Sequence, residues 1–195
     1  MTEDERRLAF ARQFVVQARS DWGVYKLLAA CRDVAACHKL HFLQMACEKV
    51  AKAYRLRDTK SPVDELVSRH TGFAKFVPSF CKVALGERYR GKDAQLARVI
   101  KDSRALAREI EKLAPAIDRQ ATPENAEYPW ERGDEVIAPC EHKFPSLDLL
   151  EKAGGWTFLK LIEQGLDAFD VGASASRDRG KTASAARRRW FRGGA

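Results

Sequence analysis

The sequence has little of what marks many enzymes and membrane proteins. No apolar run approaches the 18 residues of a membrane-spanning helix, which excludes a transmembrane span. No P-loop, GxGxxG, HExxH or zinc-finger spacing occurs, so we expect neither a cofactor nor a metal site. Among only four histidines, His38 and His41 lie one helical turn apart. Neither Cys37 nor Glu48 completes a metal-ligand set with them.

Cysteines are few and do not occur in C-x-x-C pairs. Their number, five, is odd and fits a reducing compartment better than a disulfide framework. Cys31, Cys37, Cys47 and Cys81 fall among helical apolar positions, which predicts buried, unreactive thiols. The first residues are acidic, and no apolar segment typical of a secretory signal follows them. We therefore expect a cytoplasmic protein.

Positive charge is concentrated at one end of the chain. The net charge is +8, yet residues 172–195 contain seven Arg or Lys against one Asp, a net +6. Residues 1–171 therefore carry only +2. Gly, Ser, Ala and Arg dominate the last segment, which predicts a disordered basic tail, 172–195, after a folded domain, 1–171. Electrostatic attraction of nucleic acid is therefore expected from the tail.

Hydrophobic periodicity predicts an all-α fold. The stretch 33–56 lacks Gly and Pro, and its apolar residues recur three and four apart, as in the central helix of a bundle. A helix is expected before it, over residues 3–18. Ser20 and Asp21 can cap a new helix start after that, and Gly23 weakens a continuous helix through this segment. We expect these helices to form an antiparallel hairpin with the central one. Further helical segments start near residues 62, 73, 93, 146 and 156. We expect the chain to form a bundle of about five to six helices.

Two later segments differ from ordinary bundle helices. Residues 93–117 repeat apolar residues in a heptad pattern, which can pack within the bundle or against a second copy in a homodimer. About three heptads are short for a free-standing coiled coil, which favours packing within the bundle. Four prolines then forbid a long helix in residues 118–145. Tyr128 and Trp130 favour a proline-rich arm that packs on the bundle, with one short strand at 135–138.

Residues 18–77, about a third of the chain, contain a second pattern, which begins with Ala18-Arg19-Ser20-Asp21 followed by Tyr25, Leu27 and Leu28. These residues are similar to the first helix of HEPN domains, small helical bundles named for nucleotide binding. The central helix is similar to the second, through Phe42, Gln44, Ala46, Glu48, Lys49, Lys52 and Ala53. His70, followed by Phe73 and Phe76, resembles the family's short H-x-x-hydrophobic segment. The resemblance implies a HEPN-like bundle.

The resemblance also implies a chemistry, because many HEPN proteins are metal-independent ribonucleases that form a cleft by dimerising. They use an Arg and a His with four to six residues between them, near the start of the final helix, to hold a phosphate and exchange a proton. Here the expected final helices, 93–114 and 156–169, contain no histidine. Only Arg32 and His38 have the family's spacing, and about one such pair is expected by chance in this composition. The catalytic residues are therefore left unassigned.

The tail is the second candidate site. Guanidinium groups that bind phosphate and aromatic rings that stack on bases together favour single-stranded nucleic acid. The predicted binding residues are Arg187, Arg188, Arg189, Trp190 and Arg192. A solubilising end without a partner and attraction to an anionic membrane surface are alternative interpretations of this segment.

Two functional classes follow from these patterns. The first is a HEPN-like, non-catalytic protein that associates with RNA, another nucleic acid or a protein partner. Its setting, as the resemblance implies, is prokaryotic defence or a toxin–antitoxin pair. The second is a metal-independent endoribonuclease with its site in a homodimer cleft.

Overall fold

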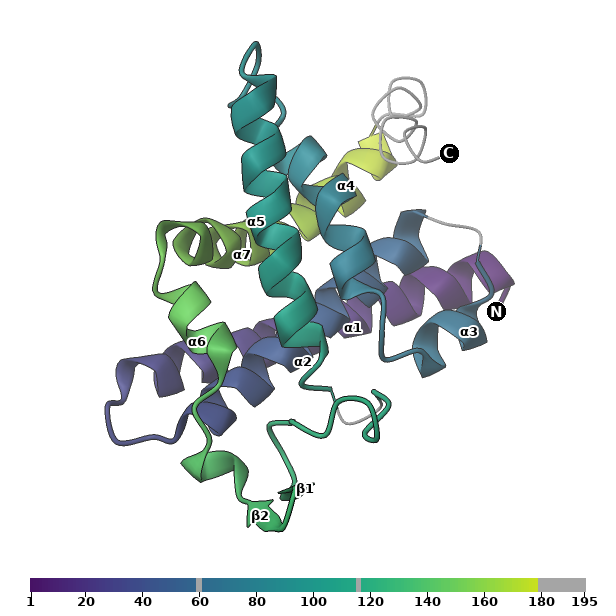
Figure 1. Ribbon diagram of the computed structural model, residues 1–195. Helices are drawn as coiled ribbons and strands as arrows, with labels where there is room; N and C mark the ends of the chain where they lie inside the picture. The colour runs from purple at the N-terminus through teal and green to yellow at the C-terminus, as the bar shows by residue number, and fades with distance from the viewer. Residues whose placement is uncertain (59–60, 115–116, 179–195) are drawn as a thin grey trace.

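The computed structural model describes residues 1–58, 61–114 and 117–178, with the backbone alone at residues 147 and 170–178. Within these ranges the chain forms seven α-helices, one short 3-10 helix and one two-stranded sheet (Figure 1). The all-α prediction is confirmed. The number of helices exceeds the predicted five to six, and two of the seven, α3 (Val63–Ser68) and α6 (Pro145–Leu150), have only six residues each. No helix in the described ranges is long and apolar enough to cross a membrane.

The two longest helices of the N-terminal half, α1 (Glu3–Ala30) and α2 (Ala36–Asp58), form the predicted antiparallel hairpin (Figure 1). The predicted new helix start at Ser20 and Asp21 is wrong, because α1 continues unbroken through Gly23. Asp21 is buried against α2 and caps no helix. The apolar face of α2 is fully buried, which confirms its central place in the bundle.

An aromatic cluster joins α2 to α4 (Phe73–Leu85) and α7 (Ala153–Asp178). The ring of Tyr54 lies 5.6 Å from that of Phe76, 5.5 Å from that of Phe80 and 5.3 Å from that of Phe169. The Tyr54 hydroxyl donates a hydrogen bond of 2.8 Å to the carbonyl of Gly165. These rings form the core of the bundle, and the hydroxyl is satisfied within it.

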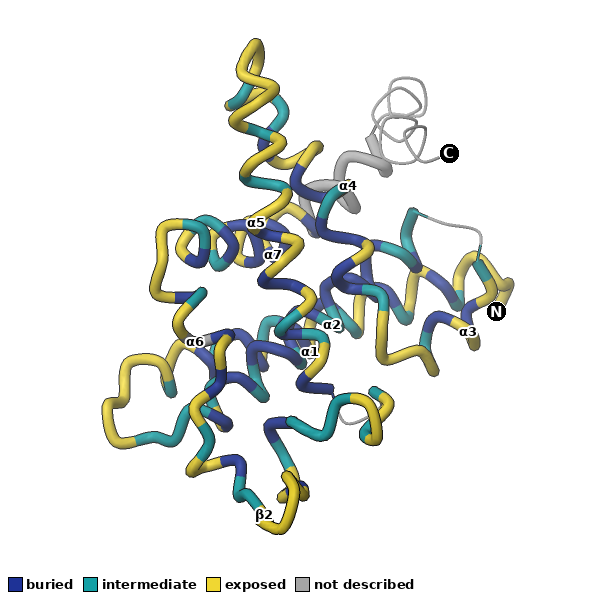
Figure 2. The backbone as a smooth tube through the Cα atoms, viewed as in Figure 1, coloured by how far each residue is buried: buried dark blue, intermediate teal, exposed yellow. Residues whose placement is uncertain are grey.

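The heptad segment forms α5 (Asp93–Glu111), which uses its apolar face within the chain. Leu106 and Ile110 are buried in the core, whereas Leu96 and Val99 near the start of the helix are only partly buried. The first half of α5 and the end of α4 therefore extend from the body as a hairpin, visible at the top of Figure 1 and largely exposed in Figure 2.

The proline-rich arm packs on the bundle, as predicted. Trp130 and Phe144 of the arm are buried. Nδ1 of His41 on α2 lies 3.2 Å from Oε1 of Glu127 in the arm. The predicted strand is present as β2 (Glu135–Ile137), paired with β1 (Trp130–Arg132), which the sequence did not indicate. The short 3-10 helix η1 (Pro139–Glu141) follows and packs against α2.

The predicted boundary of the basic tail falls inside a helix. The backbone of α7 extends to Asp178, six residues beyond residue 172, through a segment that contains the good helix formers Ala173 and Ala175. The five predicted nucleic-acid-binding residues, Arg187 to Arg192 with Trp190, lie outside the described residues. That site therefore stays a prediction.

The thiols follow the prediction with one correction. Cys37, Cys47 and Cys81 are buried, whereas Cys31 is exposed and so is Cys140. Cys31 lies directly after the end of α1, in the turn toward α2, where no neighbouring element covers it.

Candidate functional site

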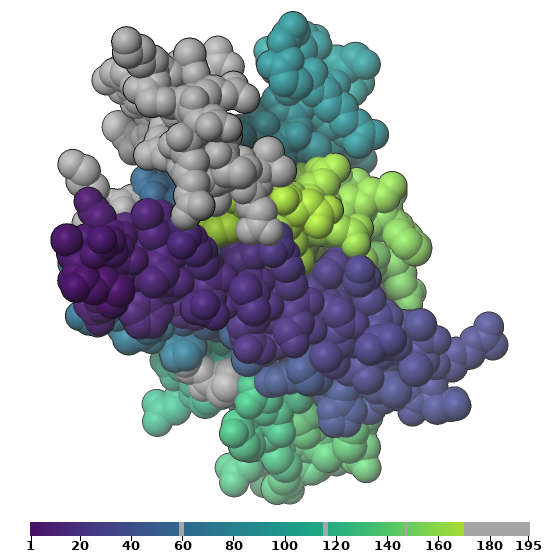
Figure 3. Space-filling model, turned by 180° about the vertical axis from the view of Figure 1, so that it is seen from behind, coloured from purple at the N-terminus to yellow at the C-terminus, as the bar shows by residue number. Residues whose placement is uncertain are grey.

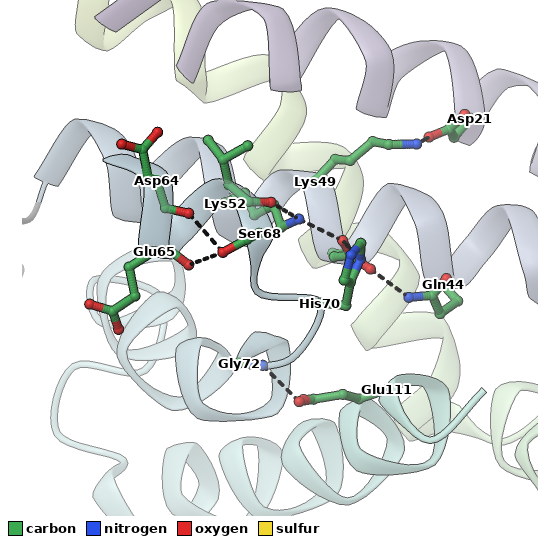
Figure 4. Close-up of polar contacts among 12 residues, drawn as sticks. Asp21, Gln44, Lys49, Lys52, Asp64, Glu65, Ser68, His70, Gly72 and Glu111 are labelled. Atoms are coloured by element: carbon green, nitrogen blue, oxygen red, sulfur yellow. Dashed lines mark hydrogen bonds and ion pairs between the residues drawn. The ribbon is translucent and has the colours of Figure 1, made fainter. Parts of the chain in front are cut away.

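A polar network centred on Glu48 joins α2 to the loop between α3 and α4, and Figure 4 labels its partners Gln44, Lys52 and His70. Glu48 Oε2 accepts a hydrogen bond of 3.0 Å from Gln44 Nε2. Glu48 Oε1 lies 2.9 Å from Lys52 Nζ and 3.1 Å from His70 Nδ1. The side chain of Glu48 is 13% exposed and that of His70 is 53% exposed. The imidazole therefore reaches a largely buried carboxylate from the surface.

Helical spacing and the end of α3 position this network. Gln44, Glu48 and Lys52 follow one another at intervals of four residues, which places them on one face of α2. Lys52 Nζ also donates a hydrogen bond of 2.8 Å to the carbonyl of Val67 at the end of α3. One lysine thus connects the carboxylate on α2 to the segment that leads into His70.

A glycine and a carboxylate then set the turn after His70. Gly72 has φ +120°, a conformation that L side chains rarely adopt, and a Cβ there would lie 2.6 Å from Arg55 Nη1. Glu111 of α5 accepts a hydrogen bond of 2.7 Å from the backbone N–H of Gly72 (Figure 4). It accepts a second, also of 2.7 Å, from the backbone N–H of Ala74. The carboxylate satisfies two free donors at the start of α4 and interacts favourably with the helix dipole.

A second ion pair lies beside the network and joins α1 to α2 (Figure 4). Lys49 Nζ lies 2.5 Å from Asp21 Oδ2, and Gln17 Nε2 donates a hydrogen bond of 3.0 Å to Asp21 Oδ1. The side chains of Lys49 and Asp21 are 13% and 6% exposed. Charges this deeply buried stabilise the packing of two helices only when both partners are present.

Two arginines lie close to the loop that carries His70. Arg69 is paired with Glu65 at 2.8 Å on the surface. Burial, followed by the nearby positive charge of Arg69, lowers the pKa of Arg55. An imidazole held by a carboxylate, and guanidinium groups on or close to the same loop, are the types of group needed for proton transfer beside a bound phosphate.

The pair with the family's spacing, Arg32 and His38, lies elsewhere. Both side chains are exposed at the turn between α1 and α2. His38 is ten residues before Glu48 on α2, about 15 Å along the helix axis. In the described ranges, no three His, Cys, Asp or Glu side chains lie close enough together to hold a metal ion.

The arm contains a separate cavity of about 520 Å³. Its lining includes Arg119, Asn125, Tyr128 and Trp130. Arg119 donates hydrogen bonds to the carbonyls of Thr122 and Glu124, and Asn125 accepts two from the backbone of the same arm. These two polar side chains therefore order the arm itself.

Residues far apart in the sequence lie together around α2. Asp21 pairs with Lys49, and Glu48 accepts from His70, across 28 and 22 residues of sequence. Comparison of the chain with models of known families, with curated proteins and with solved structures gives no significant match.

Proposed function

We propose that this protein is a HEPN-like helical protein that associates with nucleic acid without cleaving it. The observation that carries the non-catalytic part is the engagement of the polar residues on α2. Both oxygens of Glu48 have partners, Lys52 bridges two segments, and Lys49 is paired with Asp21. Groups engaged in this way stabilise helix packing and are not available to bind a substrate.

Association with nucleic acid rests on the charge of the chain. Residues 172–195 contribute a net +6 of the total +8. Arginines next to Trp190 combine phosphate binding with base stacking, which suits a single strand. Binding of this kind releases counterions and therefore weakens steeply as salt is added.

Fluorescence anisotropy with a labelled 20-nucleotide RNA tests the proposal. Replacing Arg187, Arg188, Arg189 and Arg192 with Gln should weaken binding, and the slope of log affinity against log salt should become shallower by about 0.7 for each phosphate that the variant no longer neutralises. The control replaces four exposed cations of the body with Gln: Arg12, Lys75, Lys152 and Lys160. Equal weakening in both variants would indicate a general charge effect, and no binding by the wild-type chain would contradict the proposal.

The resemblance to HEPN domains suggests a setting in prokaryotic defence or a toxin–antitoxin pair, where a protein partner is the alternative to nucleic acid. Purification of the full chain from its own cells distinguishes the two. Nuclease-sensitive material that elutes with the protein supports the proposal. A single stoichiometric polypeptide and no nucleic acid would favour a protein partner instead.

A second candidate, the metal-independent endoribonuclease, is favoured by the exposure of His70. Its Nδ1 faces Glu48, so Nε2 is the ring nitrogen left for a substrate. If the chain cleaves RNA with this group, His70→Gln should abolish cleavage of a structured RNA panel in the presence of EDTA, with His38→Ala as the comparison. Loss of cleavage in His38→Ala alone would move the site to the turn between α1 and α2.

A further inference from the structure

The hairpin formed by the end of α4 and the first half of α5 carries an excess of positive charge. Between residues 82 and 104 there are seven Lys or Arg against three Asp or Glu, a net +4. Residues 1–171 together carry a net charge of +2, so the residues of this range outside 82–104 carry a net charge of −2. The near-neutral body therefore contains a strongly basic projection on an acidic remainder.

The cations of α5 form a stripe, which we call the basic ridge: Arg98, Lys101, Arg104 and Arg108. These residues are three or four apart, so they follow one side of the helix for about 15 Å. The buried residues Ser103, Leu106 and Ile110 occupy the opposite side. The fold of α5 therefore turns the ridge away from the core.

The ridge is exposed and unpaired within the described part of the chain. All four side chains are exposed, and none of them forms an ion pair with a described carboxylate. The hairpin projects from the body in Figure 1, and the space-filling view from behind shows the same projection (Figure 3). Arg98 and Lys101, in the first half of α5, therefore lie on the part of the chain that projects from the bundle, where a partner of extended shape can reach them.

We infer that the basic ridge binds the phosphate backbone of a nucleic-acid duplex, an inference that rests on the proposed association with nucleic acid. Cations fixed at regular intervals on a rigid helix suit the fixed rows of phosphates in a duplex. The ridge contains no aromatic residue to stack on the bases of a single strand. Two copies of the ridge would repel each other, which disfavours a dimer contact. The buried apolar residues Leu106 and Ile110 of α5 lie on the opposite side of the helix, which disfavours insertion of the ridge into a membrane.

The test compares two triple variants of the full chain on a labelled 20-base-pair duplex. The ridge variant is Arg98→Gln, Lys101→Gln and Arg104→Gln, and the matched control is Arg12→Gln, Lys75→Gln and Lys160→Gln. Circular dichroism should show both variants folded, because all six positions are exposed and Gln is a good helix former. Three duplex phosphates that are no longer neutralised make the log–log salt slope shallower by about 2.7. Between 50 and 200 mM salt, the affinity of the wild type should therefore fall about 40-fold more than that of the ridge variant.

Each outcome decides the inference. A shallower slope and weaker duplex binding in the ridge variant alone support it. If the ridge variant binds the duplex with the affinity and salt slope of the wild type, the inference is wrong. The effect of the tail variant on binding of single-stranded RNA then shows whether the proposed function still holds. If the wild-type chain binds neither nucleic acid, the proposed function fails as well. If the ridge variant loses affinity for phosphatidylserine vesicles but keeps its affinity for the duplex, the ridge is a membrane surface and the inference is wrong.

Discussion

The ammonium group of Lys49 lies 2.5 Å from the carboxylate of Asp21, and both side chains are almost entirely buried between α1 and α2. This ion pair lies between residues 28 positions apart, in the middle of the hairpin on which the bundle is built. Removing either charge leaves the other buried without a partner, which is far more costly than the removal of a surface pair.

Asp21→Ala should therefore destabilise the protein by about 3–5 kcal/mol in urea denaturation. The double variant Asp21→Ala, Lys49→Met should recover part of that stability, because no charge is left unpaired. Lys26→Ala, which removes the exposed pair with Glu163, is the control and should cost less than about 1 kcal/mol. Similar costs for Asp21→Ala and Lys26→Ala would show that the buried pair contributes no more than a surface one.

A pair of glycines gives opposite expectations for the same substitution. A Cβ at Gly165 would lie 2.7 Å from Phe80 Cζ in the aromatic core, whereas a Cβ at Gly23 meets nothing within 4 Å. Gly165→Ala should destabilise the protein by about 1–3 kcal/mol through overpacking. Gly23→Ala should stabilise it by about 0.5–1 kcal/mol, because alanine favours the helix. Thermal unfolding of both variants checks the signs, and a stabilising Gly165→Ala would contradict the packing of α7 on α4.

The carboxylate that caps α4 from α5 can be tested in the same way. Glu111→Ala removes both hydrogen bonds to the start of α4 and should cost about 1.5–3 kcal/mol. Glu109→Ala, two residues earlier, removes only a surface pair with Lys112 and should cost less than about 1 kcal/mol. Hydrogen exchange at the first turn of α4 should accelerate in Glu111→Ala alone. Unchanged exchange there would show that the cap is not needed.

Stability should fall at alkaline pH because buried acids stay protonated in the folded state. Burial raises the pKa of Tyr54 from 10.0 to about 12 and that of Cys81 from 9.0 to about 11. The unfolded chain therefore loses these protons first, so the free energy of unfolding decreases as pH rises from about 9 to about 12.

Tyr54→Phe isolates the tyrosine part of this effect. It should cost about 1 kcal/mol at pH 7 through removal of the hydrogen bond to Gly165, and then lose less stability than the wild type between pH 10 and 12. Tyr128→Phe, at a ring that is 60% exposed, is the matched control. Parallel curves for Tyr54→Phe and the wild type would contradict the burial argument.

The helical fold could be predicted from the sequence because its strongest signal is periodic. The apolar face of α2 lies in the core as its spacing indicated. The exception at Asp21 has a physical reason. A good capping residue beside a glycine is a local signal, and the burial of Asp21 against Lys49 depends on a partner far along the chain.

The candidate site could be predicted only in part, for the same reason. The spacing of apolar residues places Glu48 and Lys49 on a helix, but the pairing of Glu48 with His70 needs the fold to bring α2 beside the loop after α3. The net charge of residues 1–171 does not indicate the basic ridge, because the +4 of residues 82–104 is offset by acidic residues elsewhere in that range. A count over windows of about one hairpin would have found it.

The most direct measurement follows one labelled RNA through a salt series, with anisotropy to report binding and a denaturing gel to report its length. We expect log affinity to fall linearly with log salt while the RNA stays intact for hours in EDTA. Affinity that does not respond to salt, or fragments that appear with the wild type and disappear with His70→Gln, would contradict the account of a protein that binds nucleic acid without cutting it.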